Sequence, residues 1–420
     1  MRSFLICSLG VALVGLISES AWATYSRVES MGKRADFFMD DVSIFDNPAN
    51  MNIFPNFLIG EMGAFNQVKG AGSPALTTPT NSDPSNSWFG GIFSYSLGKH
   101  RDAPSLYPQI SIGGAFNRRD EELFSLLPDS AEGAIVPASA TNFDGFLGMT
   151  LSNGGMVGSH IYYAAQEGAN LGDGSMPPEF GGDIRLLAFR GQLGINWPLA
   201  RNVDGELSLG TAVVGYGPQA IDPELSFEVR GRAFSTLEII NGELVPLFSW
   251  SRWRTPGLSS DRYTLGIGTN VSLDRGFFWL GIEGMLNHTK SSWRMVDGKK
   301  SFYQIDGIQS EQLLQGVTIG FGIERNVWWD WMVLRVGGQK VMGYLEEDGP
   351  AANDKRSYIY TNPTGNMSSN DQIGFGIGLN VEEKLKVDAT LAEDVLYTFG
   401  NLFSSPQHHI ISRISATYSF

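Results

Sequence analysis

The sequence predicts an all-β fold, a transmembrane antiparallel β-barrel of about fourteen strands that follows a short N-terminal hatch-like segment. Three features indicate this: segments with strict apolar/polar alternation, connections that alternate between short and long, and a C-terminal strand that ends on an aromatic residue. In such a strand, successive side chains point to opposite faces of the sheet. In a membrane barrel, the apolar face meets lipid and the other face meets the lumen.

The alternation is clearest in three segments. Ile373, Phe375, Ile377 and Leu379 are separated by single glycines, and the same period of two runs through 264–273 and 317–324. The second face is unusually small, since glycine accounts for 51 of 420 residues, well above the roughly 7% average. A soluble β-sandwich is the alternative, but its solvent face would more often carry Lys, Glu and Thr.

Fourteen candidate strands emerge when they are counted backward from Phe420. The short connections fall at 153–155, 197–204, 274–276, 326–328 and 381–384, and the long ones include 217–261 and 344–370. Short turns and both termini are expected on the periplasmic side, and 223–253 could add a hairpin that projects from the rim. The strands are predicted near 58–67, 88–97, 107–117, 143–152, 156–166, 184–196, 204–216, 262–272, 277–289, 315–325, 329–343, 371–380, 385–395 and 409–420.

Aromatic residues gather near both ends of these strands, as in the girdles that flank a lipid-facing band. Ordinary packing of core aromatics at strand ends is the alternative. The predicted girdles comprise Trp197, Phe277, Phe278, Trp328, Trp329 and Trp331 near the short turns, and Trp88, Tyr216, Tyr263, Tyr344 and Tyr397 near the long loops.

Residues 1–23 are typical of a secretory signal peptide. Arg2 supplies the positive start, 4–17 is apolar, and Ala21-Trp22-Ala23 is a small-x-small cleavage pattern. A short membrane anchor is the alternative, but this apolar stretch is below the roughly 20 residues that a spanning helix needs. The single cysteine, Cys7, lies in the signal, so no disulfide is expected in the mature chain.

Several classes of function are not expected. A net charge of −14 at pH 7 argues against a nucleic-acid partner. The five histidines show no metal-ligand spacing and no Gly-x-Ser-x-Gly motif occurs, so we expect no metal, no cofactor and no catalytic residue. A hydrolase at the rim that uses His160 or His288 is ranked below the other functions considered.

The segment after the signal carries the motifs that point to a family. It contains Ser30-Met31-Gly32, then Asp40-Asp41, then Ile44-Phe45-Asp46-Asn47-Pro48-Ala49-Asn50-Met51. Over about 25 residues the chain here resembles the FadL/OmpP1-like family of outer-membrane β-barrels, including PorV-like relatives. The resemblance implies a fourteen-stranded barrel (58–420) whose N-terminal segment (24–57) folds inward as a hatch. It also implies an apolar ligand, such as a fatty acid, that passes toward a lateral opening.

Two departures from the family pattern concern this segment. Lys33-Arg34 replaces the small residues that are common after the glycine, and 24–56 is short for a full hatch. From the residues alone, Asn47-Pro48-Ala49 predicts either a bend inside the barrel or a helix end or turn that leads into the first strand.

Charged residues of both signs are predicted to face the lumen. An ion-pair network is the favoured interpretation, because an unpaired charge in a narrow interior is costly. A site for a ligand carboxylate is the alternative, with Arg190, Arg335 and Arg413 as candidates and Glu283 and Glu324 beside them. The predicted lumen set is Glu61, Arg190, Gln192, Glu206, Glu283, Glu324, Arg335, Lys386, Asp388 and Arg413.

The expected location is the outer membrane of a Gram-negative cell, with lipid, lipopolysaccharide and the barrel-assembly machinery as partners. Tyr418 and Phe420 form the expected assembly signal. The leading function is the binding or passage of a fatty acid or other apolar small molecule. The alternative is a PorV-like scaffold or secretion-system component that docks proteins through its long loops.

Overall fold

The computed structural model describes the barrel and the segment that precedes it. The described residues are 24–32, 36–62, 87–97, 108–118, 120–124, 141–169, 184–217, 224–255, 258–296, 299–301, 308–327, 329, 331–349, 352–360, 372–382, 384–391 and 411–420. The predicted signal peptide, 1–23, lies outside them.

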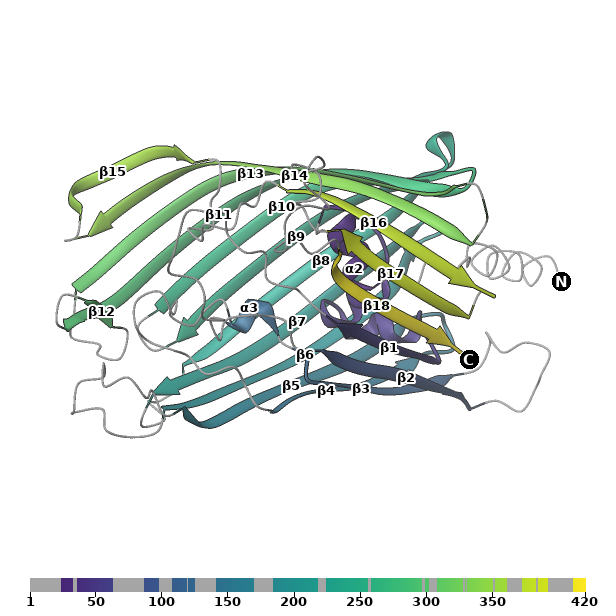
Figure 1. The fold of residues 1–420 in the computed structure, drawn as a ribbon, viewed down its shortest axis with the longest axis horizontal. Coiled ribbons are helices and arrows are strands. Elements are labelled where there is room, and N and C mark those ends of the chain that lie inside the picture. The colour runs from purple at the N-terminus through teal and green to yellow at the C-terminus, as the bar shows by residue number, and fades with distance from the viewer. Residues whose placement is uncertain are drawn as a thin grey trace, which may run out of the picture.

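The strands form one closed antiparallel barrel (Figure 1). Its sixteen wall strands pair in chain order, and β1 pairs with β18 to close the ring. The wall strands are β1 (Phe57–Met62), β2 (Trp88–Ser96), β3 (Gln109–Phe116), β4 (Thr141–Thr150), β5 (Met156–Ala169), β6 (Ile184–Ala200), β7 (Val203–Gly217), β8 (Leu225–Leu237), β9 (Gly242–Thr255), β10 (Leu258–Leu273), β11 (Gly276–Val296), β13 (Ile308–Asn326), β14 (Met332–Gly349), β16 (Gln372–Val381), β17 (Leu385–Leu391) and β18 (Ile411–Ser419).

Two further strands lie outside this ring. β12 (Lys299–Ser301) pairs with the end of β11, and β15 (Ala352–Tyr360) pairs with the end of β14. Within the ring, β11 pairs directly with β13, and β14 pairs directly with β16. β12 and β15 therefore extend two hairpins beyond the wall, and β15 lies within the connection predicted as the long loop 344–370.

The prediction of fourteen wall strands was wrong, although a strand occurs at each of the fourteen predicted places. The two missed strands are β8 and β9, which fall in the region predicted as a long connection with a hairpin on the rim. β8 carries Glu228, Arg230 and Arg232, and β9 contains Pro246, all of which are unusual in a strand. The charges fit because they face the lumen, where Arg232 pairs with Glu206 and Arg230 with Asp46.

The two faces of the wall have opposite chemistry. Large apolar side chains project outward, as at Leu265, which is 70% exposed, and Ile112, which is 61% exposed. The buried inner face carries polar and charged side chains and glycines. A closed sheet that is apolar outside and polar inside suits a bilayer and excludes the soluble sandwich. No helix in the described ranges is long and apolar enough to cross a membrane.

Most of the short turns lie at one end of the barrel together with Phe420 (Figure 1), whereas residues 256 and 257 alone separate β9 from β10 at the other end. Five of the predicted short connections are present there, and the turn between β8 and β9 adds a sixth, η6 (Glu238–Ile240). Asn241 ends η6 in the left-handed conformation, with φ of 48°, which asparagine tolerates. Which side of a membrane this end faces stays a prediction.

The predicted aromatic girdles are only partly present. Trp329 and Trp331 are exposed and stack with ring centroids 5.2 Å apart. Trp197, Tyr263 and Tyr344 are exposed as well, and Phe278 is half-buried. Trp328, Tyr397 and the side chain of Tyr216 lie outside the described part of the structure.

Two members of the predicted girdles were misplaced. Trp88 is buried inside the barrel, where it donates a hydrogen bond to Glu61, and Phe277 packs against Phe38 within the lumen. Trp88 shares the inner face of β2 with Gly90 and Ile92, and Phe277 shares that of β11 with Trp279. Position near a strand end therefore did not decide the face on which these rings lie.

The C-terminal strand closes the wall. β18 pairs with β1 from Phe57↔Ser419 to Met62↔Ile414, and the backbone N–H of Phe420 donates to the carbonyl of Asn56 at 3.2 Å. Ser415 and Thr417 face inward, whereas Tyr418 and Phe420 face outward. The predicted alternation of this strand is confirmed.

Phe420 tests whether the terminal aromatic is an assembly signal. We expect Phe420→Ala to lower the amount of barrel in the outer membrane several-fold, while the unfolding free energy of the purified barrel changes by less than about 1 kcal/mol, because the ring is 53% exposed. Membrane fractionation and thermal unfolding in detergent measure the two effects. Phe93→Ala is the matched control, since its outward ring lies 5.4 Å from that of Phe420. Equal assembly of both variants would contradict the signal role.

Candidate functional site

The N-terminal segment lies inside the barrel. We call residues 24–32 and 36–56 the lumen segment; it contains α2 (Tyr25–Ser30), η1 (Asp41–Phe45) and η2 (Pro48–Asn52). α2 contacts the inner face at β14, β16, β17 and β18, and η2 contacts β3 to β6. Figure 1 shows α2 enclosed by the strands. Most described side chains of the segment are buried, so it fills this part of the lumen.

Glycines of the wall make room for the backbone of the lumen segment. A Cβ atom on Gly374 would lie 2.4 Å from the carbonyl oxygen of Glu29, and one on Gly376 would lie 2.4 Å from the Cβ of Ser30. A Cβ on Gly337 would lie 2.2 Å from the carbonyl carbon of Met31. The small inner face seen in the sequence therefore has a structural reason, which is the close approach of a second stretch of backbone.

An aromatic side chain uses the same kind of space a few strands away, on β10 and β11. Cβ atoms on Gly268 and Gly281 would lie 2.2 and 2.1 Å from the ring of Phe37. That ring stacks on Trp279 with centroids 5.9 Å apart. Phe37 thus anchors the middle of the lumen segment in a recess that two glycines of neighbouring strands create.

The Asn47-Pro48-Ala49 motif starts η2 and attaches it to the wall. The Asn47 side chain accepts a hydrogen bond from the Ala49 N–H at 3.1 Å and donates one to Asn196 at 2.6 Å. Pro48 occupies the first turn of η2, where no backbone donor is needed. Wall glycines again allow the contact, because a Cβ on Gly194 would lie 1.9 Å from the Asn47 Oδ1. The motif is thus the start of a short helix inside the barrel, and its role in a hatch stays a prediction.

Arg27 is the main charged link between the lumen segment and the wall. Its guanidinium donates to Glu324 at 2.6 and 3.2 Å and to Asp40 at 3.2 Å. Arg335 on the wall donates to the same Glu324 at 2.5 Å and to Asp388 at 2.6 Å. Glu324 therefore accepts from two arginines, and one of them comes from the lumen segment.

The predicted lumen residues all face inward, so the strand phase was correct. Arg413 pairs with Glu61 and Glu29 at 3.2 Å each, and Glu283 is buried on the inner face of β11. Each of the three candidate arginines, Arg190, Arg335 and Arg413, pairs with at least two carboxylates. The predicted ion-pair network is present, and a role for these arginines in binding a ligand carboxylate stays a prediction that would require displacing a protein carboxylate.

Arg190 belongs to a closed ring of polar side chains farther along the lumen. Arg118 donates to Asp144 at 2.7 and 3.0 Å, and Asp144 lies 2.7 Å from His160 Nε2. His160 Nδ1 lies 2.7 Å from the Gln192 side-chain oxygen. The ring continues from Gln192 through Glu228, Arg190 and Asp120, and returns to Arg118.

This ring holds part of the β3–β4 connection inside the barrel. Asp120 accepts from the Leu123 N–H at 3.2 Å at the start of α3 (Glu121–Phe124), and Leu123 is buried in a cluster with Tyr162 and Trp253. The sequence analysis missed Arg118, Asp120 and Glu228. Two basic residues followed by three acidic residues at 118–122, and charges at every second position from Glu228 to Arg232, were the signals that could have revealed them.

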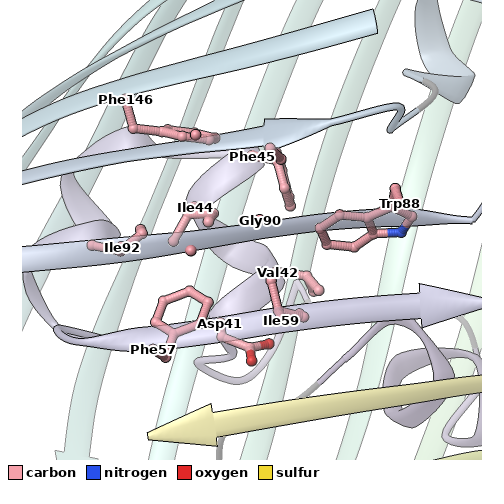
Figure 2. A pocket seen from close by; sticks show the side chains of 13 residues that line it. Asp41, Val42, Ile44, Phe45, Phe57, Ile59, Trp88, Gly90, Ile92 and Phe146 are labelled. Carbon is pink, nitrogen blue, oxygen red and sulfur yellow. The ribbon is translucent and has the colours of Figure 1, made fainter. Parts of the chain in front are cut away.

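A pocket lies between the lumen segment and the shortest part of the wall (Figure 2). As its side chains lie, the pocket has room for about one water molecule. Aromatic and aliphatic side chains of η1 and β1 to β4 line it, and glycines of β2 and β3 lie behind them. The lining comprises Asp41, Val42, Ile44, Phe45, Phe57, Ile59, Trp88, Gly90, Gly91, Ile92, Gly114, Ala115 and Phe146.

The two histidines considered for a rim hydrolase differ in their burial and in their contacts. His160 is buried, engaged at both ring nitrogens, and stacked on Phe146 with centroids 4.5 Å apart. His288 is partly exposed and pairs with Glu311 at 2.5 Å. Among the described residues, no cluster of three or more His, Cys, Asp or Glu could hold a metal ion.

No protein-family model matches the sequence, and no curated protein matches it significantly. Among solved structures, the CymD monoaromatic hydrocarbon channel is similar over 95% of this chain and 99% of its own, with 10% identity and a TM-score of 0.38. CdiB from Escherichia coli is similar over 87% of this chain, which spans 63% of CdiB, with 10% identity and a TM-score of 0.40. BamA from Haemophilus ducreyi lacking POTRA domains 1-3 is similar over 87% of this chain and 70% of its own, with 8% identity and a TM-score of 0.37. At this level of similarity, none assigns a family or a function.

Asp120 gives a prediction for the acid stability of the inward-folded connection. Burial opposes its charge, but Arg190 and Arg118 outweigh burial and lower the pKa of Asp120 from 3.8 to about 2. Because the pKa of Asp120 is lower in the folded than in the unfolded state, its ionised carboxylate stabilises the folded state above pH 4. This contribution is lost as the pH falls from about 4 to 2. The difference corresponds to roughly 2 kcal/mol.

The measurement is thermal unfolding by circular dichroism in detergent between pH 6 and pH 2. Asp120→Asn is expected to be less stable than the wild type above pH 4, and the gap should close toward pH 2. Arg118 and Arg190 keep Asp144 and Glu228 as partners in the variant, so folding is expected. A gap that is the same at every pH would contradict the assignment.

Proposed function

We propose that this protein is an outer-membrane β-barrel that binds hydrophobic small molecules and lets them pass, with both termini in the periplasm. The observation that carries the proposal is a lumen filled by its own N-terminal segment beside a pocket with aromatic walls. The sequence resemblance of that segment to the FadL/OmpP1-like family supports it.

The chemistry of the pocket favours an apolar ligand. Phe45, Phe57, Trp88 and Phe146 line it, and the indole N–H of Trp88 is already bonded to Glu61 at 3.2 Å. Moving apolar surface from water to such a wall contributes roughly 25 cal/mol per Å². Once the lumen segment shifts to make room, a ligand of this kind would gain free energy against these side chains, whereas a strongly hydrated solute would lose its water without replacement.

Passage would require the lumen segment to shift, because it occupies the interior at this level. Its contacts with the wall divide into strong charged links around Arg27 and neutral links around η2, where Asn47 and Asn50 bond to Asn196. Neutral hydrogen bonds contribute less than charge-assisted ones. We therefore expect η2 to detach more readily than α2.

A substitution on β6 tests whether η2 controls passage. Gly194→Ala would place a Cβ 1.9 Å from the Asn47 Oδ1 and 2.9 Å from the Pro48 Cδ, and so push η2 off the wall. We expect a several-fold faster entry of an apolar dye or radiolabelled fatty acid into vesicles that contain the variant, with a loss of about 1–3 kcal/mol in stability.

Gly191→Ala is the matched control, because it makes the same change on the same strand and its nearest neighbour, a Phe189 ring atom, would be 3.8 Å away. Asn47→Ala loosens η2 without a clash, at a cost of about 0.5–2 kcal/mol, and should act like Gly194→Ala. If Gly194→Ala and Asn47→Ala both admit the solute at the wild-type rate, η2 does not control passage.

The scaffold role is the second candidate, and the filled lumen favours it as well. A barrel whose interior is closed by the lumen segment and by the inward-folded residues 118–124 could present its loops to a partner protein without passing any solute. Charged links such as Arg27 to Glu324 and Arg190 to Asp120 would then serve rigidity.

Purification in mild detergent separates the two candidates. The channel predicts that a lipid, fatty acid or other apolar molecule remains bound and is detected by mass spectrometry of the extracted protein. The scaffold predicts a stoichiometric partner protein instead. A Gly194→Ala preparation should lose the small molecule and a Gly191→Ala preparation should keep it; a partner protein that binds both equally would favour the scaffold.

A further inference from the structure

Four basic side chains lie together on the outer face of the barrel, near the end opposite Phe420. Arg252 and Arg254 belong to β9, and His288 and Lys290 belong to β11. Trp253, between the two arginines, is buried in the lumen, so the arginines on either side of it face outward. We call these four residues the basic cluster.

The strand register aligns the basic cluster in two rows. β10 lies between β9 and β11. In the first row, Arg252 and His288 flank Asp261, and in the second row the other two basic residues flank Ser259. Neighbouring strands are about 4.8 Å apart, so the two backbones of a row are about 10 Å apart. Long basic side chains can therefore reach one group that lies over the middle strand.

Two carboxylates are shared among these four basic side chains. Asp261 accepts hydrogen bonds from both arginines, at 2.7 and 3.2 Å. Glu311 on β13 pairs with Lys290 at 3.2 Å and with His288 at 2.5 Å. Three cationic side chains and an imidazole thus face two carboxylates, although the whole chain carries a net charge of −14. The side chains of Arg252 and Lys290 are 47% and 59% exposed, so a molecule at the surface can reach them.

The basic cluster begins where the outward apolar band ends. On the same face, the next row toward the middle of the barrel contains Trp250 and Tyr263, and the row after it contains Phe248 and Leu265. The Arg252 guanidinium lies 5.8 Å from the centroid of the Trp250 ring. A molecule that covers both regions needs an anionic group joined to hydrocarbon chains, which is the chemistry of an acidic lipid.

The anionic group that fits the basic cluster best is a phosphate. Guanidinium groups bind phosphate oxygens through parallel hydrogen bonds, and lysine adds a compact charge. A free phosphate ion would gain nothing from the adjoining apolar band, whereas a lipid phosphate would be held by both regions. On β14 the exposed side chains Glu346 and Asp348 are acidic, which confines the favourable area to β9, β10 and β11.

We propose that the basic cluster binds the phosphate groups of lipid A, the lipid part of lipopolysaccharide, while its acyl chains lie along Phe248 and Leu265. This site goes beyond the proposed function and uses only its orientation, because periplasmic termini place this end of the barrel in the outer leaflet. Lipid A carries phosphate at both ends of its sugar headgroup, which suits basic side chains spread over three strands better than a single phosphodiester does.

Binding of lipid A to the full-length barrel in nonionic detergent tests this site. Fluorescent lipid A is titrated into the protein, with unlabelled lipid A, its dephosphorylated form and phosphatidylglycerol as competitors. For the wild type we expect lipid A to compete at least tenfold better than the dephosphorylated form, because each basic side chain near an anionic lipid contributes to binding. The difference should shrink as the salt concentration rises, since salt screens exposed charges.

The variants change binding in opposite directions. Arg252→Gln with Arg254→Gln should weaken lipid A binding at least tenfold. Arg201→Gln with Arg275→Gln is the matched control, because it removes the same charge from exposed positions at the short-turn end and should change binding less than twofold. Asp261→Asn removes the carboxylate that competes with phosphate, so it should bind lipid A several-fold more tightly, which damage to the fold would not produce.

The contrary results are equally specific. The site is overturned if both double variants bind lipid A equally well, if the dephosphorylated form competes as strongly as lipid A, or if Asp261→Asn binds more weakly than the wild type. Tighter binding of phosphatidylglycerol than of lipid A would overturn the choice of lipid and the orientation. Passage of an apolar solute is measured separately with Gly194→Ala, so failure of the lipid site and failure of the channel are distinguishable.

Discussion

The close approach of the lumen segment to the barrel wall is the constraint on which the rest of the structure depends. Backbone atoms of Glu29 and Met31 and the Ser30 side chain occupy positions that a Cβ on Gly374, Gly337 or Gly376 would fill. A wall with ordinary side chains at these places would hold the segment away from the strands. The hydrogen bonds and ion pairs of the segment require that proximity, because they act over about 3 Å. The glycines therefore determine that this lumen is filled by backbone rather than by side chains of the strands.

Filling the lumen also explains the distribution of charge. A closed interior has little water, so each buried charge needs a partner nearby. Wall residues alone do not provide these partners. Arg230 pairs with Asp46 and Arg232 donates to the carbonyl of Asp36, both in the lumen segment. Arg190 pairs with Asp120 in the inward-folded connection. The barrel and the elements inside it thus form one electrostatic unit.

Much of the fold could be predicted from the alternation of apolar and polar residues alone. Alternation determines which face of a strand each residue takes. It was therefore enough to predict fourteen of the strands and the inward direction of Glu324, Arg335 and Asp388. The prediction missed β8 and β9 for a physical reason. In the sequence alone, charged residues whose partners lie inside the lumen cannot be distinguished from the charged residues of a solvated loop. The ring from Arg118 through His160 to Glu228 could not be predicted, since its members come from distant segments that meet only when the connection after β3 folds inward.

The seam between β1 and β18 has a consequence for the order of assembly. These strands join the first and last parts of the barrel through six residue pairs, so closure brings together parts of the chain separated by most of its length and is entropically the most demanding pairing. The lumen segment is joined directly to β1 and is surrounded by strands from every part of the ring. The closing pair of strands and the filling of the lumen therefore depend on the same stretch of chain, because β1 follows the lumen segment directly.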